Sequence, residues 1–182
     1  QWWEGAQRTQ LDFFDSHLKE KNKEIHFPQI NLWNITTKSW ELSVQNKTPT
    51  WNLRSEGLAS INHLEGGLVP NSDLEADSEV NLVHDPWRPI PSIGGHLSDT
   101  AGEANRYQLD IRPDVAVFTS DPILKDLRLE GIPTLFLETN CDRESFDLFV
   151  ALSIIPKEVE NTVTQLSTGV LRISHCDKGI TS

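Results

Sequence analysis

The feature that most constrains the fold of this chain is a series of short apolar runs. They recur every 8 to 12 residues or so and are separated by turn-forming residues. Beyond residue 80, these candidate strands are residues 115–119, 127–129, 134–138, 146–155 and 170–174. Pro122, Pro133 and Pro156 lie near the ends of the runs, where a proline removes no ladder hydrogen bond. The pattern predicts a mainly β fold, an antiparallel β-sandwich of jelly-roll type with two sheets.

The start of the chain follows a helical period instead. Leu11, Phe14 and Leu18 are spaced i, i+3 and i+7, so they share one face of a helix predicted over residues 7–19. Trp2 and Trp3 precede it with more apolar area than an isolated helix can bury, which predicts a partner surface outside this chain.

Between the helix and the sandwich strands, the pattern shortens and alternates. A hairpin is predicted from two apolar runs, Ile30, Leu32 and Trp33, then Trp40, Leu42 and Val44. Residues 45–79 are rich in Asn, Ser and Gly and predict an irregular connection with one or two short strands, and turns at Gly66-Gly67 and residues 71–73. We therefore expect a terminal helix in residues 1–27 and a sandwich in residues 28–182.

Charge and composition exclude several classes of function. Sixteen basic and 27 acidic residues give a formal net charge of −11, and the one lysine cluster, residues 19–23, is interrupted by Glu20. A nucleic-acid surface needs a basic stripe, so this partner is not expected. No run approaches the roughly 20 apolar residues of a membrane span, and no signal peptide is recognisable. We expect a cytoplasmic protein that does not bind membranes.

Cysteine and methionine usage adds two expectations. Cys141 and Cys176 lie far apart and outside any Cys-x-x-Cys pair, which predicts two buried thiols in a reducing compartment rather than a zinc site or a disulfide. Methionine is absent, even at position 1. This absence predicts that the chain is cut from a longer product, although a sequence lacking some of its residues would give the same count.

Motifs for catalysis and metal binding are weak. The Gly-x-Ser-x-Gly turn of serine hydrolases is absent, and Ser92 in Ser92-Ile93-Gly94-Gly95 lacks the preceding glycine. The pairs His84 with Asp85 and His96 with Asp99 lie in a loop-like stretch where polar residues cap turns. The acidic positions 142, 144 and 147 do not match a calcium loop. We predict no catalytic, cofactor-binding or metal-binding residue in this chain, and no cofactor.

The tryptophans leave an alternative open. Trp33, Trp40, Trp51 and Trp87 occur in or beside predicted strands and loops, as in a sugar-binding platform, although aromatic residues also build cores and domain seams. A carbohydrate-binding β-sandwich module is therefore the alternative function, and an enzyme active by itself is a third hypothesis.

A series of motifs lies in a fixed order along the chain, at residues 11–19, 30–41, 85–95, 112–120, 129–131, 145–150 and 169–172. This series resembles the C-terminal region of the X-Pro dipeptidyl-peptidase and cocaine-esterase family of α/β-hydrolases. Residues 11–19 resemble the last helix of the hydrolase domain, and residues 30–41 resemble the strand pair that follows. The Asp-Pro and Gly-Gly segment at 85–95 and the stretch at 112–120 are close to the family pattern, the latter most of all. Residues 129–131, 145–150 and 169–172 continue the series.

The resemblance implies a parent serine hydrolase with a Ser-His-Asp triad, whose three members would all lie upstream of Gln1. This chain would be an inactive accessory domain, a galactose-binding-like jelly roll that carries the terminal helix left over from the α/β-hydrolase domain. It would pack on the hydrolase domain of the same polypeptide, with the crossing at 85–95 near the seam, and shape the substrate cleft. Peptidase, esterase and acylase activities of the parent stay open, as does a homo-oligomer.

The sequence departs from the family at three places. His84 stands where the family often has tyrosine, and the loop at residues 140–145 differs from the family's Asp-Thr-Asp-Phe type. The family's sandwich also continues for several strands beyond the region that matches Arg172. We therefore expect either a truncated sandwich or an exposed edge covered by another copy.

Overall fold

The computed structural model describes residues 2–19, 30–44, 49–70, 79–94, 102–157 and 159–174. The chain divides into two compact units, Gln1–Thr48 and Pro49–Ser182. The domain boundary predicted at residues 27 and 28 and the turn predicted at residues 71–73 lie outside the described residues. In the part of the chain that is described, no helix is long and apolar enough to cross a membrane.

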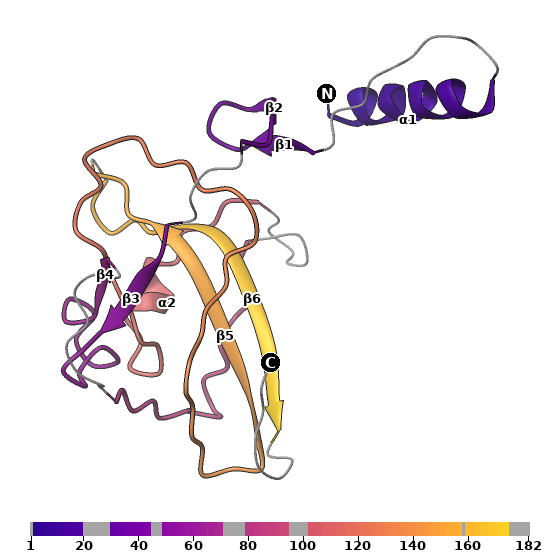
Figure 1. Cartoon of the computed structure of the whole chain (residues 1–182). Helices are drawn as coiled ribbons and strands as arrows, with labels where there is room; N and C mark the ends of the chain where they lie inside the picture. Colours follow the sequence, from indigo (N-terminus) through magenta and orange to yellow (C-terminus); the bar gives the residue numbers. More distant parts are fainter. Residues whose placement is uncertain are drawn as a thin grey trace. The chain divides into compact units, whose positions relative to one another are not determined.

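The described residues of the first unit form one helix and one hairpin (Figure 1). Helix α1, Trp2–Leu18, confirms the predicted helix and begins earlier than residue 7. Leu11, Phe14 and Leu18 on its apolar stripe are all exposed within this chain. Strands β1, Asn31–Asn34, and β2, Ser39–Leu42, confirm the hairpin and pair antiparallel, with Trp33 opposite Trp40.

The hairpin has two unlike faces. On one face, Glu41 Oε1 accepts hydrogen bonds from Asn34 Nδ2 and Thr37 Oγ1, both at 2.9 Å. On the other face, the rings of Trp33 and Trp40 meet edge to face at 5.4 Å. Alternation of side chains along a strand accounts for this separation, since residues two apart share a face. The aromatic pair stabilises the hairpin across its strands.

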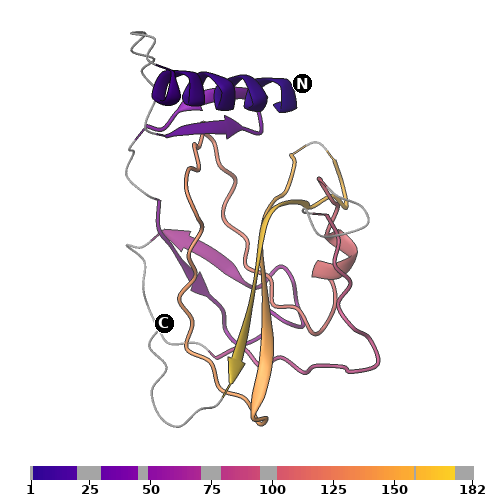
Figure 2. The ribbon, with the colours of Figure 1, turned by 90° about the vertical axis from the view of Figure 1, so that its right-hand side faces the viewer.

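Where the second unit is described, it contains two hairpins and one helical turn (Figures 1 and 2). Strands β3, Trp51–Arg54, and β4, Gly67–Pro70, form the first hairpin and confirm the short strands expected in residues 45–79. Helix α2, Tyr107–Asp110, was not predicted, because a single turn is too short for a helical period. Strands β5, Ser145–Ile154, and β6, Thr164–Ser174, form a long antiparallel hairpin with a register shift at Leu152 and Ser153.

Strands β5 and β6 confirm the last two predicted runs, and β6 begins earlier than predicted. The prediction of strands at 115–119, 127–129 and 134–138 is wrong, since none of these segments forms a strand. Within 115–119, Thr119 makes one isolated parallel bridge with Gly67, and Val117 N donates to Ala59 O at 3.1 Å. An alternating pattern produces a strand only where a second strand supplies a ladder, and no ladder forms on these segments among the described residues.

The turn predicted at Gly66-Gly67 is also wrong. The chain turns earlier, where the N–H groups of Ile61 and Asn62 both donate to Leu58 O at 2.8 Å. Gly67 is already the first residue of β4. Gly66 is buried against the backbone of Val117, so a glycine is required there for close approach rather than for a turn.

The described strands form three separate two-stranded sheets, so the fold is mainly β and antiparallel, without closure into a sandwich. Ala59 and Leu109 are the buried hydrophobic residues in the described ranges, and Ser55, Ser60 and Gln165 are the buried polar ones. Many large apolar side chains stay exposed. A hairpin of two strands is marginal by itself, so these sheets depend on further contacts to be stable.

Candidate functional site

A proline-rich segment of the second unit is held at two points by side chains from distant parts of the sequence. We call residues 85–94 the anchored loop; it contains Pro86, Pro89 and Pro91 and has no helix or strand. At its start, Asp85 Oδ1 accepts from Trp87 N at 2.9 Å, and Asp85 O accepts from Arg88 N at 3.1 Å. The aspartate therefore caps a tight turn, and the prolines restrict φ within the turn and after it.

The first anchor is the guanidinium group of Arg112, which lies just after α2. Its Nε and Nη2 donate to the two carboxylate oxygens of Asp114 at 2.7 and 2.5 Å, and Nη2 also donates to Arg88 O at 2.5 Å. The Arg112 and Asp114 side chains are only 10% and 7% exposed. The fork orients the guanidinium group so that it reaches the loop carbonyl, because an Arg paired with a carboxylate at two points has little freedom to rotate.

This pairing shifts both groups toward their charged forms. The hydrogen bond from Arg112 is the main cause that lowers the pKa of Asp114 below its ordinary value, and desolvation opposes it. The hydrogen bond to Asp114 is likewise the main cause that raises the pKa of Arg112. The anchor is therefore fully charged at neutral pH.

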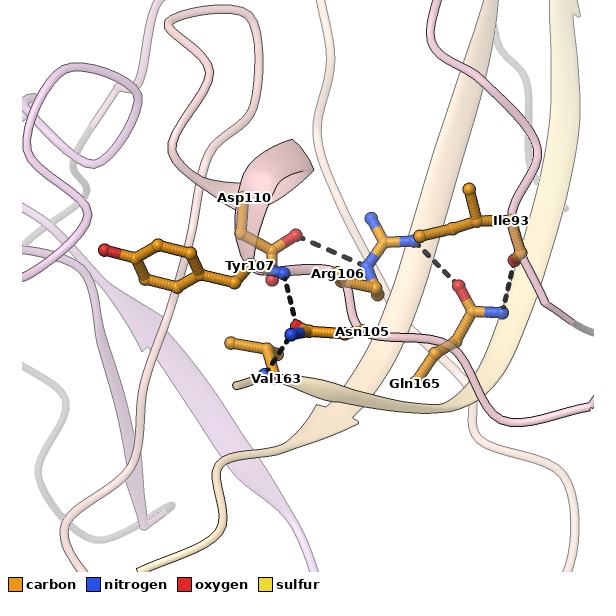
Figure 3. Close-up of polar contacts among 7 residues, drawn as sticks. All are labelled: Ile93, Asn105, Arg106, Tyr107, Asp110, Val163 and Gln165. Carbon is orange, nitrogen blue, oxygen red and sulfur yellow. Dashed lines mark hydrogen bonds and ion pairs between the residues drawn. The ribbon is translucent and has the colours of Figure 1, made fainter. Parts of the chain in front are cut away.

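The second anchor is Gln165, near the start of β6 (Figure 3). Its Nε2 donates to Ile93 O at 3.0 Å, and its Oε1 accepts from Arg106 Nη1 at 2.8 Å. Arg106 Nε then donates to Asp110 Oδ1 at 3.3 Å. Gln165 is 8% exposed, so both halves of its amide are used in a site where an unpaired polar group would be costly.

Asn105 fixes the base of this network (Figure 3). Its Oδ1 accepts from Tyr107 N and Val163 N, both at 3.0 Å, and its Nδ2 donates to Asn161 O at 3.1 Å. These bonds hold the start of α2 against the start of β6. Burial raises the pKa of Asp110 above its ordinary value, and the charge of Arg106 offsets this in part. The carboxylate of Asp110 is thus partly desolvated, and it accepts the hydrogen bond that positions Arg106.

Gly94 closes the loop at a position that only glycine fits. Its φ is +62°, and a Cβ added there would lie 2.7 Å from Ala104 Cβ and 2.8 Å from Gly102 O. The left-handed conformation and the missing side chain are therefore both needed. Gly94 therefore marks a close approach between the end of the loop and residues 102–104.

Trp87 lies on the anchored loop and is 91% exposed to solvent. Leu82 and Val83, just before the loop, are exposed too. The indole therefore stands on a turn that is fixed on both sides. Sequence reasoning named Trp87 only as one of four tryptophans of a sugar-binding alternative, and it did not single out Arg106 or Gln165. Only the tertiary structure shows which side chains hold the loop and which one it presents.

The weak candidates from the sequence lie as follows. Ser92 and His84 are exposed, and Asp85 is committed to the turn. His96, Asp99 and Cys176 lie outside the described residues, and Cys141 is a free thiol. Asp142 and Asp147 form exposed ion pairs with Arg143 and Arg172, both at 3.8 Å. In the described ranges, no group of three or more His, Cys, Asp or Glu residues is arranged to hold a metal ion.

The four tryptophans of the sugar-binding alternative are divided between the two units. Trp33 and Trp40 belong to the first unit, whereas Trp51 lies in β3 and Trp87 on the anchored loop of the second. Trp51 is half-buried.

Comparison with known proteins gives one clear result. Searches among curated proteins and among solved structures find no match. A family model described as the X-Pro dipeptidyl-peptidase C-terminal non-catalytic domain matches residues 8–178, which is nearly the whole chain. The resemblance inferred from the short motifs is confirmed, and the chain belongs to the family of X-Pro dipeptidyl-peptidase C-terminal non-catalytic domains.

Proposed function

We propose that this accessory domain packs on the catalytic domain of an X-Pro dipeptidyl-peptidase and forms part of the wall of its substrate cleft. Membership of a non-catalytic family makes the chain an accessory domain of a peptidase. The proposal includes a parent enzyme of the serine hydrolase type with a catalytic triad, whose relatives include esterases and acylases. It also includes closure of the β-strands into a jelly-roll sandwich. The residues that attack the substrate would then lie in the catalytic domain, and this chain would limit which substrates can enter the cleft.

The observation that carries the packing is the amount of exposed apolar surface. Residues 120–141 show it most plainly, because Leu124, Ile132 and Phe136 are 92%, 93% and 85% exposed. Soluble proteins seldom leave so many large apolar side chains in contact with water, and large exposed patches mark interaction sites. A catalytic domain on the same polypeptide is a partner that every copy of the chain carries with it.

The anchored loop supports the second half of the proposal. A cleft wall must hold its shape to discriminate between substrates, since a displacement of about 1 Å can change rates strongly. The loop meets this requirement through Arg112, Gln165 and its prolines.

Cross-linking of the full-length peptidase tests the packing. Lys125 is exposed and adjoins Leu124, so a lysine-reactive cross-linker should join it to lysines of the catalytic domain. The control variant Lys125→Arg should lose these products without any change in activity. Products confined to this chain, or formed only between copies, would refute the packing.

Kinetics tests the cleft wall. The full-length variant Asp114→Asn should loosen the anchored loop and change KM for X-Pro peptides in a way that depends on peptide length. Its rate of inactivation by a small serine-directed phosphonate should stay at the wild-type value, because the reacting groups lie elsewhere. Equal effects on all substrates and on the phosphonate would show that the loop has no part in the cleft.

A further inference from the structure

We propose that Trp87 is the anchor side chain of the interface between this domain and the catalytic domain, where its indole fills an apolar pocket. The inference rests on the proposed function and adds to it the residue that carries most of the binding energy. It follows from three properties of the anchored loop: the exposure of Trp87, the rigidity of its turn and the engagement of the polar groups around it.

The first property is the exposure of Trp87 to solvent. The Trp87 side chain is 91% exposed, and Val83 and Leu82 nearby extend the apolar surface along the chain. Tryptophan has the largest apolar area of any side chain and is enriched among the residues that dominate interface energetics. Asp85 and Arg88 flank it with charge, so an apolar centre is bordered by polar residues, as at the core and rim of an interface.

The second property is the rigidity of the turn that carries Trp87. The N–H of Trp87 itself donates to Asp85 Oδ1, and the carbonyl of the next residue, Arg88, accepts from Arg112. Arg112 is fixed in turn by its fork on Asp114. The backbone that carries the indole is therefore ordered before any partner arrives, so docking loses little conformational entropy. A large aromatic side chain that protrudes from a fixed backbone is costly in water and suits a complementary pocket.

The polar groups around Trp87 argue against a sugar as the occupant. Stacking on a sugar needs neighbouring donors and acceptors for its hydroxyl groups, and two of the nearest acceptors, Asp85 Oδ1 and the Arg88 carbonyl, already hold the turn together. The catalytic domain is favoured over a second copy of the chain, because a partner on the same polypeptide is present at high effective concentration.

Hydroxyl-radical footprinting of the full-length peptidase, read by mass spectrometry, tests the proposal directly. We expect Trp87 to be oxidised many times more slowly than in the urea-unfolded protein, despite its exposure within this chain. Rapid oxidation of Trp87 together with protection of Phe136 would overturn the anchor and leave the proposed function standing. Rapid oxidation of both Trp87 and Phe136 would overturn the anchor and the proposed function together. Protection lost on dilution to the monomer, or present only with added saccharide, would also overturn the proposal.

Variants give an independent measurement. Trp87→Ala in the full-length protein should raise hydrogen exchange of residues 82–94 about 30-fold, as loss of a dominant interface side chain implies. Trp87→Phe keeps an aromatic ring and should recover part of the protection. Trp87 is 91% exposed, so Trp87→Ala should leave the packing of the described residues intact. Unchanged exchange in Trp87→Ala would overturn the proposal.

Discussion

The anchored loop and residues 120–141 share a lack of helix and strand and a content of prolines, yet they differ in what holds them. In the loop, Arg112 and Gln165 donate to the carbonyls of Arg88 and Ile93, and both donors are nearly buried. In residues 120–141, Leu124, Ile132 and Phe136 face water. Irregular backbone thus becomes rigid where side chains from distant elements satisfy its carbonyls, and otherwise depends on a partner.

The two regions each contain a glycine with positive φ, and substitution of these glycines should show the largest contrast. Gly94→Ala should destabilise the protein by about 3 kcal/mol, because the new Cβ adds a steric clash with Ala104 to the backbone strain. Gly131→Ala has φ +101° but open space around it, so it should cost about 1 kcal/mol. Urea unfolding of the two variants measures the difference. Equal costs would show that the loop is not tightly packed at Gly94.

Replacement of Gln165 tests the second anchor. Gln165→Leu should cost about 2 kcal/mol, because Arg106 Nη1 and Ile93 O both lose a partner in a buried site. Gln165→Glu keeps an acceptor for Arg106 but replaces the donor to Ile93 with a buried carboxylate oxygen that repels that carbonyl, so it should also release the end of the loop. Hydrogen exchange at residues 92–94 would report the release. Unchanged exchange in both variants would mean that other contacts hold this end.

Acid should weaken the first anchor. The folded-state pKa of Asp114 is lowered, so its contribution is present above its unfolded value, near 3.8, and is lost as pH falls through the folded pKa. Stability should therefore decline at the acid end of a series from pH 7 downward, and Asp114→Asn should flatten that decline. Asp110, whose pKa is raised, contributes with the opposite sign and gains protons first. A decline that is identical in Asp114→Asn would contradict this assignment.

The smallest effect should come from a surface ion pair in the other region. Arg128 Nε lies 3.2 Å from Glu130 Oε2, and the two side chains are 37% and 18% exposed. Arg128→Ala should cost less than about 1 kcal/mol, because the pair is partly exposed and salt screens it. Thermal melting at low and high salt measures this cost. A cost as large as that of Gln165→Leu would mean that residues 120–141 are held as firmly as the anchored loop.

Prediction from the sequence succeeded where a pattern is local. The helical period of Leu11, Phe14 and Leu18 located α1, and the alternating runs around Trp33 and Trp40 located the first hairpin. The strands predicted at 115–119, 127–129 and 134–138 failed, since a ladder depends on a second strand that no local pattern specifies. Arg106 and Gln165 could not have been paired from the sequence, because 59 positions separate them.

The amino-acid sequence by itself determined the family, the mainly β character and the positions of the helix and the longest strands, because these follow from local periodicity and from short motifs in a fixed order. Only the tertiary structure decided that Arg112 and Gln165 hold residues 85–94 and that Trp87 is left exposed. Hydrogen bonds between residues far apart in the chain depend on how the backbone folds back on itself, and side-chain exposure depends on what the remaining residues cover.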